Sequence, residues 1–141
     1  MIKTRFWRQR KNHALECRIY AERPEKNFLP SPGKLPCLCF PVHRDDLRID
    51  CGLREGDEVT PFYDPMIAKV IIRVPTREAA INKMRDALAQ TRIQGVYTNL
   101  EFLLEVLSDP EFEQARMTTR YVENKQALAK KATQATAAIP T

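Results

Sequence analysis

The sequence contains no apolar run of the roughly 18 residues that a membrane-spanning helix needs. Its first twelve residues, MIKTRFWRQRKN, are basic but lack an apolar core segment, so we expect no secretory signal peptide there. The same segment has no serine and no amphipathic pattern, which argues against a transit peptide. With 43% hydrophobic and 29% charged residues over 141 positions, the composition is that of one soluble globular domain.

Acidic residues are absent from both ends of the chain. Residues 1–12 and 125–141 hold eight of the 23 basic residues and none of the 18 acidic ones, so the body between them has a net charge of −3. A domain that reads nucleic acid carries its basic side chains on a folded face. We therefore expect neither a nucleic-acid nor a membrane partner for the body. Binding to either through the basic ends stays open, and deletion of both ends would test it.

The four cysteines do not follow the spacing of a zinc site. Cys37, Cys39, His43 and Cys51 fall within fifteen residues, but structural zinc sites separate paired cysteines by two to four residues. Because cysteine is readily buried, we interpret the four as small core residues and predict no metal site. Free thiols without an export signal indicate a reducing compartment, so we expect the cytoplasm, or the mitochondrial matrix in a eukaryote.

Apolar and polar residues alternate with the period of two that is typical of strands. The segments that we expect to be strands are 13–22, 35–40, 47–51 and 66–74. Three prolines, a serine and a glycine occupy 23–34, so we expect no regular element there. The chain between 52 and 59 has glycine and charged residues and is predicted to turn.

Helical periods follow the last of these strands. Thr76 is predicted to cap a helix that ends near Gln90, and TNLE at 98–101 fits a capping box before a second helix. That second helix places Leu100, Leu103, Leu104 and Leu107 on one stripe. Asp109 and Pro110 begin a short third helix, and 91–96 is a short strand or turn. From Glu123 the chain is a helix-prone tail that we expect to become disordered by about Thr133.

The order of elements, strands first and helices afterwards, predicts an α+β fold in which helices cover one side of an antiparallel sheet. Lys69 lies in the segment FYDPMIAKVII, whose apolar run belongs to the long predicted strand 66–74. It shares the less apolar face with Arg73, where a lysine stem covers apolar surface while its ammonium group stays in water. This interpretation is favoured over a catalytic lysine, which would need burial to shift its pKa.

Five collinear segments resemble a known family. They read HALECRIYAE, NFLPSPGK, LRID, EGDEVTPFYDPMIAK and TREAAINKMRDALAQTRIQGVYTNLEFL. In this order and spacing they are similar to the C-terminal domain of biotin carboxylase, the ATP-dependent component of acetyl-CoA, propionyl-CoA, methylcrotonyl-CoA, pyruvate and urea carboxylases. The resemblance covers about 13–123. We therefore expect a basic non-matching segment at 1–12, the carboxylase domain at 13–123, and a helix-prone to disordered tail at 124–141.

The resemblance implies one catalytic residue, Arg48, at the arginine of the family's V-R-x-D/E strand. Its implied role is to hold the biotin ureido oxygen and stabilise the anion that forms when the ureido nitrogen loses its proton. A planar, permanently charged guanidinium suits that role. Read from the sequence alone, Arg48 would be a strand-face arginine paired with Asp50. Tyr63, Asp64 and Lys69 are then expected to brace the strand and turn that present Arg48.

The family's ATP-grasp lobes, its metal-binding carboxylates and its general base all precede this domain, so ATP and Mg²⁺ or Mn²⁺ are expected to bind there. The implied partners are that ATP-grasp half, a biotin carboxyl carrier domain that presents biotin, and a second copy in a homodimer. Asn12, Arg23 and the segment PVHRDD at 41–46 depart from the family pattern. The last of these could alter how Arg48 is aimed.

Two functions compete. The first is an essential part of a biotin carboxylase, an ATP-dependent ligase, which would be inactive alone without its ATP-grasp partner. The chain would then be a gene fragment, a split subunit or a remnant. The alternative is a non-catalytic interaction module that keeps the fold and binds partners through a sheet edge or the helices.

Overall fold

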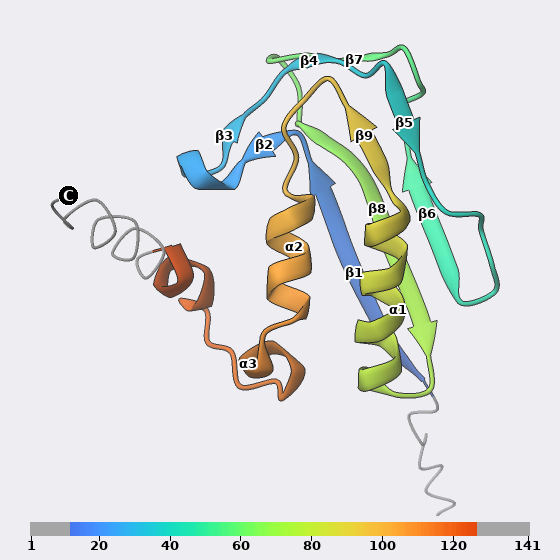
Figure 1. The fold of residues 1–141 in the computed structure, drawn as a ribbon, viewed down its shortest axis with the longest axis vertical. Helices are drawn as coiled ribbons and strands as arrows, with labels where there is room; N and C mark the ends of the chain where they lie inside the picture. The colour runs from blue at the N-terminus through green and yellow to red at the C-terminus, as the bar shows by residue number, and fades with distance from the viewer. Residues whose placement is uncertain (1–11, 127–141) are drawn as a thin grey trace, which may run out of the picture.

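The computed structural model describes residues 12–126, and three antiparallel strands form its centre (Figure 1). β8 (Met66–Val74) pairs with β1 (His13–Tyr20) on one side and with β6 (Leu47–Cys51) on the other. The predicted strands 47–51 and 66–74 are confirmed. The first predicted strand ends two residues early, because the register shifts between Ile19 and Tyr20 and the amide of Ala21 donates to the carbonyl of Pro65 at 2.8 Å.

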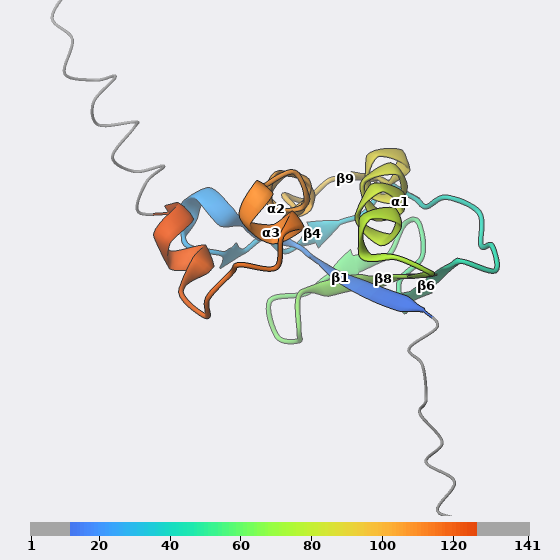
Figure 2. The same cartoon turned by 90° about the horizontal axis from the view of Figure 1, so that it is seen from below.

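Two helices cover one face of this sheet, as Figure 2 shows from below. α1 (Arg77–Gln90) packs against β8 and β1, and α2 (Leu100–Leu107) packs beside α1. The helical stripe predicted for α1 is the buried one, formed by Ala80, Ile81, Met84, Ala87 and Leu88. The α+β fold with an antiparallel sheet covered on one side is therefore confirmed. Within residues 12–126, no helix covers the opposite face of the sheet, which we call the open face.

Short elements surround this centre. The elements of two to three residues pair as β2 (Glu22–Arg23) with β3 (Leu29–Pro30), β4 (Gly33–Lys34) with β7 (Glu58–Val59), and β5 (Cys37–Cys39) with β9 (Arg92–Gln94). A 3-10 turn, η1 (Pro24–Lys26), lies inside the first pair. The prediction of no regular element in 23–34 was wrong. Prolines are tolerated here because Pro24 begins a helical turn and pairs this short need few backbone donors.

Two of the three predicted helix caps are confirmed. Oγ1 of Thr76 accepts from the amide of Ala79 at 3.2 Å at the start of α1. Oδ1 of Asp109 accepts from the amide of Glu111 at 2.9 Å at the start of α3 (Pro110–Glu113).

The third predicted cap, the capping box at 98–101, was wrong. The residue that precedes α2 is Asn99, and its side chain makes no cap hydrogen bond. It bonds β1 instead: Oδ1 accepts from the amide of Tyr20 at 2.9 Å, and Nδ2 donates to the carbonyl of Arg18 at 3.0 Å. Asn99 therefore joins the start of α2 to the end of β1.

The two ends of the chain lie outside the described residues, at 1–11 and 127–141. The predictions of a basic segment at 1–12 and of disorder by Thr133 therefore fall there. Residues 121–126 are helical. No helix within 12–126 is long and apolar enough to cross a membrane.

Candidate functional site

Arg48 stands on the open face of the sheet. It is the second residue of β6, an edge strand, and its neighbours Leu47 and Ile49 are buried toward the helices. Because successive side chains of a strand point to opposite faces, Arg48 and Asp50 share the side of the sheet that none of the described helices covers. The Arg48 side chain is 72% exposed. A cation presented in this way is free to meet a ligand.

The guanidinium of Arg48 is held at one nitrogen. Its Nε donates to Oδ1 of Asp50 at 2.8 Å. This hydrogen bond and the opposite charges raise the pKa of Arg48 and lower that of Asp50. Within residues 12–126, Nη1 and Nη2 of Arg48 make no hydrogen bond or ion pair. The pairing predicted from the strand pattern is therefore present, and it leaves two donor nitrogens available.

The segment that leads into β6 is anchored to two other elements. Its residue Asp46 accepts from Nζ of Lys83 on α1 and lies 3.5 Å from Nε of Arg44. The carbonyl of Asp46 accepts from the amide of Arg73 on β8 at 3.0 Å. The charged segment at 41–46, which departs from the family pattern, is thus fastened immediately before Arg48. Sequence reasoning missed the anchor, because Asp46 and Lys83 are 37 residues apart and no local pattern links them.

Lys69 occupies the middle of the open face. In the strand register it lies opposite Asp50 on β6 and opposite Arg18 on β1. It is partly exposed, as the alternation pattern predicted, and its charge contributes to lowering the pKa of Asp50. Lys69 is therefore part of the charged surface around Arg48 rather than an isolated buried amine.

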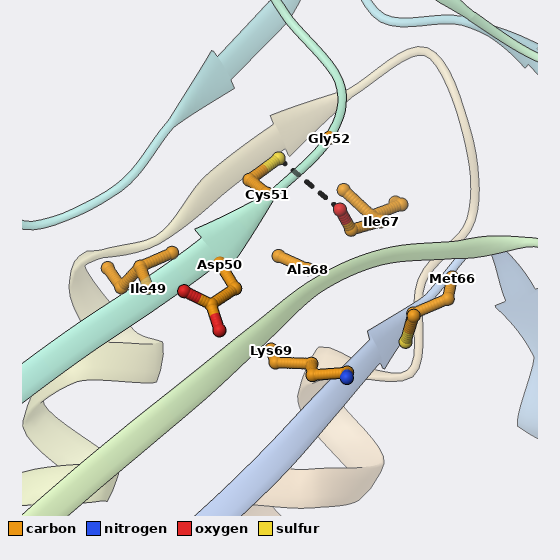
Figure 3. A pocket seen from close by; sticks show the side chains of 8 residues that line it. All are labelled: Ile49, Asp50, Cys51, Gly52, Met66, Ile67, Ala68 and Lys69. Carbon is orange, nitrogen blue, oxygen red and sulfur yellow. Dashed lines mark hydrogen bonds between the residues drawn. The ribbon is translucent and has the colours of Figure 1, made fainter.

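A shallow open pocket of about 590 Å³ lies beside Asp50 and Lys69 (Figure 3). It lies where β6 ends and β8 begins, and its lining residues are Ile49, Asp50, Cys51, Gly52, Met66, Ile67, Ala68 and Lys69. The Cys51 thiol lies 3.3 Å from the carbonyl oxygens of both Leu53 and Ile67, and the second contact is drawn in Figure 3. These sulfur contacts tie the end of β6 to the start of β8 and to Leu53.

The turn before β8 carries two exposed aromatic residues. Phe62 and Tyr63 are 87% and 81% exposed. The turn is nevertheless fixed, because Oδ1 of Asp64 accepts from the amide of Met66 at 2.9 Å. Asp64 thus stabilises the turn before β8, as expected. Tyr63 is exposed, so it does not pack against this turn within the described part of the chain.

The cysteines differ more than the sequence suggested. Cys17 is buried in the core, and burial raises its pKa to about 12. Cys51 is partly buried, as is Cys37, but Cys39 is exposed, so the prediction of a core role was wrong for Cys39. It lies in β5, which pairs only with β9 among the described strands. Across residues 12–126, no three His, Cys, Asp or Glu side chains are grouped to hold a metal ion.

The chain is similar to biotin-dependent carboxylases over most of its length. The mitochondrial methylcrotonoyl-CoA carboxylase subunit alpha of Dictyostelium discoideum is 43% identical over 110 residues, which are 78% of this chain and 16% of that protein. Biotin carboxylase 2 of Bacillus subtilis is 42% identical over 115 residues, covering 82% of this chain and 26% of the relative. This chain thus spans only a minor part of the length of either relative.

Solved structures agree with the sequence relatives. The biotin carboxylase domain of Hydrogenobacter thermophilus 2-oxoglutarate carboxylase was solved as a dimer with MgADP, ADP and bicarbonate. It matches with a TM-score of 0.76 and 39% identity, over 79% of this chain and 24% of that one. The family described as the biotin carboxylase C-terminal domain matches residues 16–124. The chain therefore belongs to the biotin carboxylase C-terminal domain family.

Proposed function

We propose that this chain supplies the C-terminal part of a biotin carboxylase and that Arg48 is its catalytic residue. The observation that carries the proposal is the exposed Arg48 guanidinium on the open face of β6, which has two nitrogens without partners in the described part of the chain. Arg48 lies within residues 16–124, which the family model covers, and the sequence resemblance implies that it corresponds to the arginine of the family's V-R-x-D/E strand. Its hydrogen bond to Asp50 raises further a pKa that already lies far above any working pH.

The chemistry asked of Arg48 is charge stabilisation. When a ureido nitrogen of biotin loses its proton, negative charge develops on the ureido oxygen. A guanidinium that donates to that oxygen stabilises the charge more strongly than it stabilises neutral biotin, which is the condition for accelerating the reaction. Arginine does not lose its own proton in this step, because its pKa lies far above any working pH. Arg48 therefore acts as a donor and not as the general base.

ATP, Mg²⁺ or Mn²⁺, and bicarbonate are assigned to the ATP-grasp part of such an enzyme. The solved relative holds MgADP and bicarbonate in a chain of which this one covers 24%, which supports the assignment. Biotin would arrive on a carrier domain as the substrate. We further propose a homodimer, since the same relative was solved as one. We also propose that the protein works in the cytoplasm, or in the mitochondrial matrix of a eukaryote. Relatives named as mitochondrial support the second location.

Reconstitution tests this proposal. The chain is mixed with a separately expressed ATP-grasp part of a relative such as the Bacillus subtilis enzyme, and bicarbonate- and biotin-dependent ATP hydrolysis is measured. We expect activity only when both pieces are present. Absence of activity with two ATP-grasp parts of different origin, while circular dichroism shows a folded chain, would contradict the enzyme proposal and favour an interaction module.

A further inference from the structure

Asp50 restricts the orientation of the Arg48 guanidinium but bonds only one of its three nitrogens. The two residues are two positions apart on β6, so both side chains lie on the open face. The contact uses Nε of Arg48 alone, at 2.8 Å from Oδ1 of Asp50. A guanidinium is planar, so fixing Nε limits the directions in which Nη1 and Nη2 can point.

We infer that Asp50 is a positioning residue: its carboxylate holds the Arg48 side chain against β6 so that the two terminal nitrogens stay aimed at a ligand above the open face. The inference deepens the proposed function and, for its catalytic consequence, rests on it. Register supports it as well, because Lys69 lies directly opposite Asp50 on β8. The hydrogen bond from Arg48 and, to a smaller extent, the charge of Lys69 lower the pKa of the Asp50 carboxyl.

The pair contributes little to the stability of the fold. Asp50 is 43% exposed and Arg48 is 72% exposed. Ion pairs that are this exposed typically contribute little to folding stability, because water and salt screen them. Loss of the Asp50 carboxylate should therefore leave the fold intact and change the mobility of Arg48, which makes the two effects separable by experiment.

The chain carries a matched control on β1, the strand on the other side of β8. On β1, Nε of Arg18 lies 2.8 Å from Oε1 of Glu16, again two positions apart on an exposed face. Glu16→Ala removes an ion pair of the same geometry without touching Arg48. Any general effect of weakening the charged sheet surface would appear in this variant too.

The first measurement is the NMR order parameter of the Arg48 Nε–Hε group in the full-length chain labelled with 15N. We expect an ordered group in the wild type, a mobile one in Asp50→Ala, recovery in Asp50→Glu, and no change at Arg48 in Glu16→Ala. An Arg48 group equally ordered in Asp50→Ala and in the wild type would overturn the inference. This comparison needs no turnover, so it decides the positioning role whether or not a reconstituted enzyme is active.

The second measurement is the rate of biotin carboxylation by the chain mixed with an ATP-grasp part. We expect Asp50→Ala to lower kcat on the order of 10-fold with the KM for ATP unchanged, because misaiming the donor weakens only transition-state contacts. Asp50→Glu should recover part of the loss and Glu16→Ala should match the wild type. A wild-type rate in Asp50→Ala, with a large loss in Arg48→Ala, would refute the positioning role alone. A wild-type rate in Arg48→Ala would refute the proposed function.

Discussion

Asn99 joins the start of α2 to Tyr20 at the end of β1, although 79 positions separate the two residues. The side-chain Oδ1 of Asn99 accepts from the backbone amide of Tyr20 at 2.9 Å, and the backbone amide of Asn99 donates to the carbonyl of Tyr20 at 3.3 Å. Nδ2 also donates to the carbonyl of Arg18, so Asn99 is bonded to two residues of β1. Asn99 is 5% exposed, so these groups have little access to water.

Asn99→Ala should lower the free energy of unfolding by roughly 2 to 3 kcal/mol, because it leaves a backbone donor and a backbone acceptor without their partners. Asn99→Asp should not restore stability, since a carboxylate cannot donate to the carbonyl of Arg18. Urea denaturation followed by circular dichroism measures both. Asn82→Ala, on the exposed side of α1, is the control and should change stability by less than about 0.5 kcal/mol. An equal loss in the Asn99 and Asn82 variants would contradict this account.

Gly95 is expected to tolerate no side chain. Its φ is +94°, and a Cβ there would overlap the carbonyl oxygen of Lys34 and lie 2.6 Å from Cδ of Pro36. Gly56 has a similar φ of +92°, but a Cβ would meet nothing within 4 Å. Gly56→Ala should therefore cost about 1 to 2 kcal/mol for the backbone strain alone. Gly95→Ala should cost roughly 3 kcal/mol or more, because overpacking adds to that strain.

The difference between the two glycine variants, measured by thermal unfolding, isolates the close approach of Gly95 to the chain at Lys34. If Gly95→Ala and Gly56→Ala lost the same stability, the tight contact between β4 and the end of β9 would be incorrect.

Thiol reactivity should distinguish two of the cysteines. Burial raises the pKa of Cys17 to about 12, so its thiolate fraction at pH 8 is on the order of one in ten thousand. Cys39 is exposed. Iodoacetamide added to the native chain at pH 8 should label Cys39 and leave Cys17 unmodified, as read by peptide mass spectrometry. Unfolding in urea should make both react, and labelling of native Cys17 at the rate of Cys39 would be inconsistent with its burial.

The anchor between Asp46 and Lys83 should depend on pH. The Lys83 ammonium beside Asp46 lowers the pKa of that carboxyl below its unfolded value of about 3.9. The stabilisation is therefore complete above about pH 4 and is lost as the pH falls through the lower pKa of the folded state. Lys83→Met keeps the apolar stem and removes the charge, so it should reduce the Tm at pH 7 by an amount that shrinks toward zero in acid.

Thermal unfolding between pH 7 and pH 2 measures this trend, with Lys26→Met, an exposed lysine of η1, as the control. A Tm difference for Lys83→Met that stayed constant down to pH 2 would mean that the ion pair does not stabilise the segment before Arg48.

Local patterns predicted the long elements of the fold. The alternation in 47–51 and 66–74 and the apolar stripe of α1 correspond to β6, β8 and the buried helix face. These elements could be predicted because burial on one side imposes a strict period on the sequence. The same period places Arg48 on the face opposite the core, so its exposure followed from the sequence as well.

Long-range contacts could not be predicted from a single sequence. Asn99 fits a helix start as well as a strand partner, and only its distance from Tyr20 in the fold decides between them. The pairing of β5 with β9 joins segments that are more than fifty residues apart. The ion pair between Asp46 and Lys83 likewise joins residues that are 37 positions apart in the sequence. Such contacts depend on tertiary geometry, which no local pattern encodes.

The central claim is that Arg48 is catalytic, and one comparison of variants tests it most directly. Bicarbonate- and biotin-dependent ATP hydrolysis is measured for the chain mixed with an ATP-grasp part, with wild type, Arg48→Ala and Arg18→Ala assayed in parallel. Arg18 is an arginine on the same face with the same ion-pair geometry, so it controls for lost surface charge. The account predicts a loss of 100-fold or more, on the order expected for one oxyanion donor, in Arg48→Ala and near wild-type activity in Arg18→Ala. Equal activity in all three proteins would contradict it.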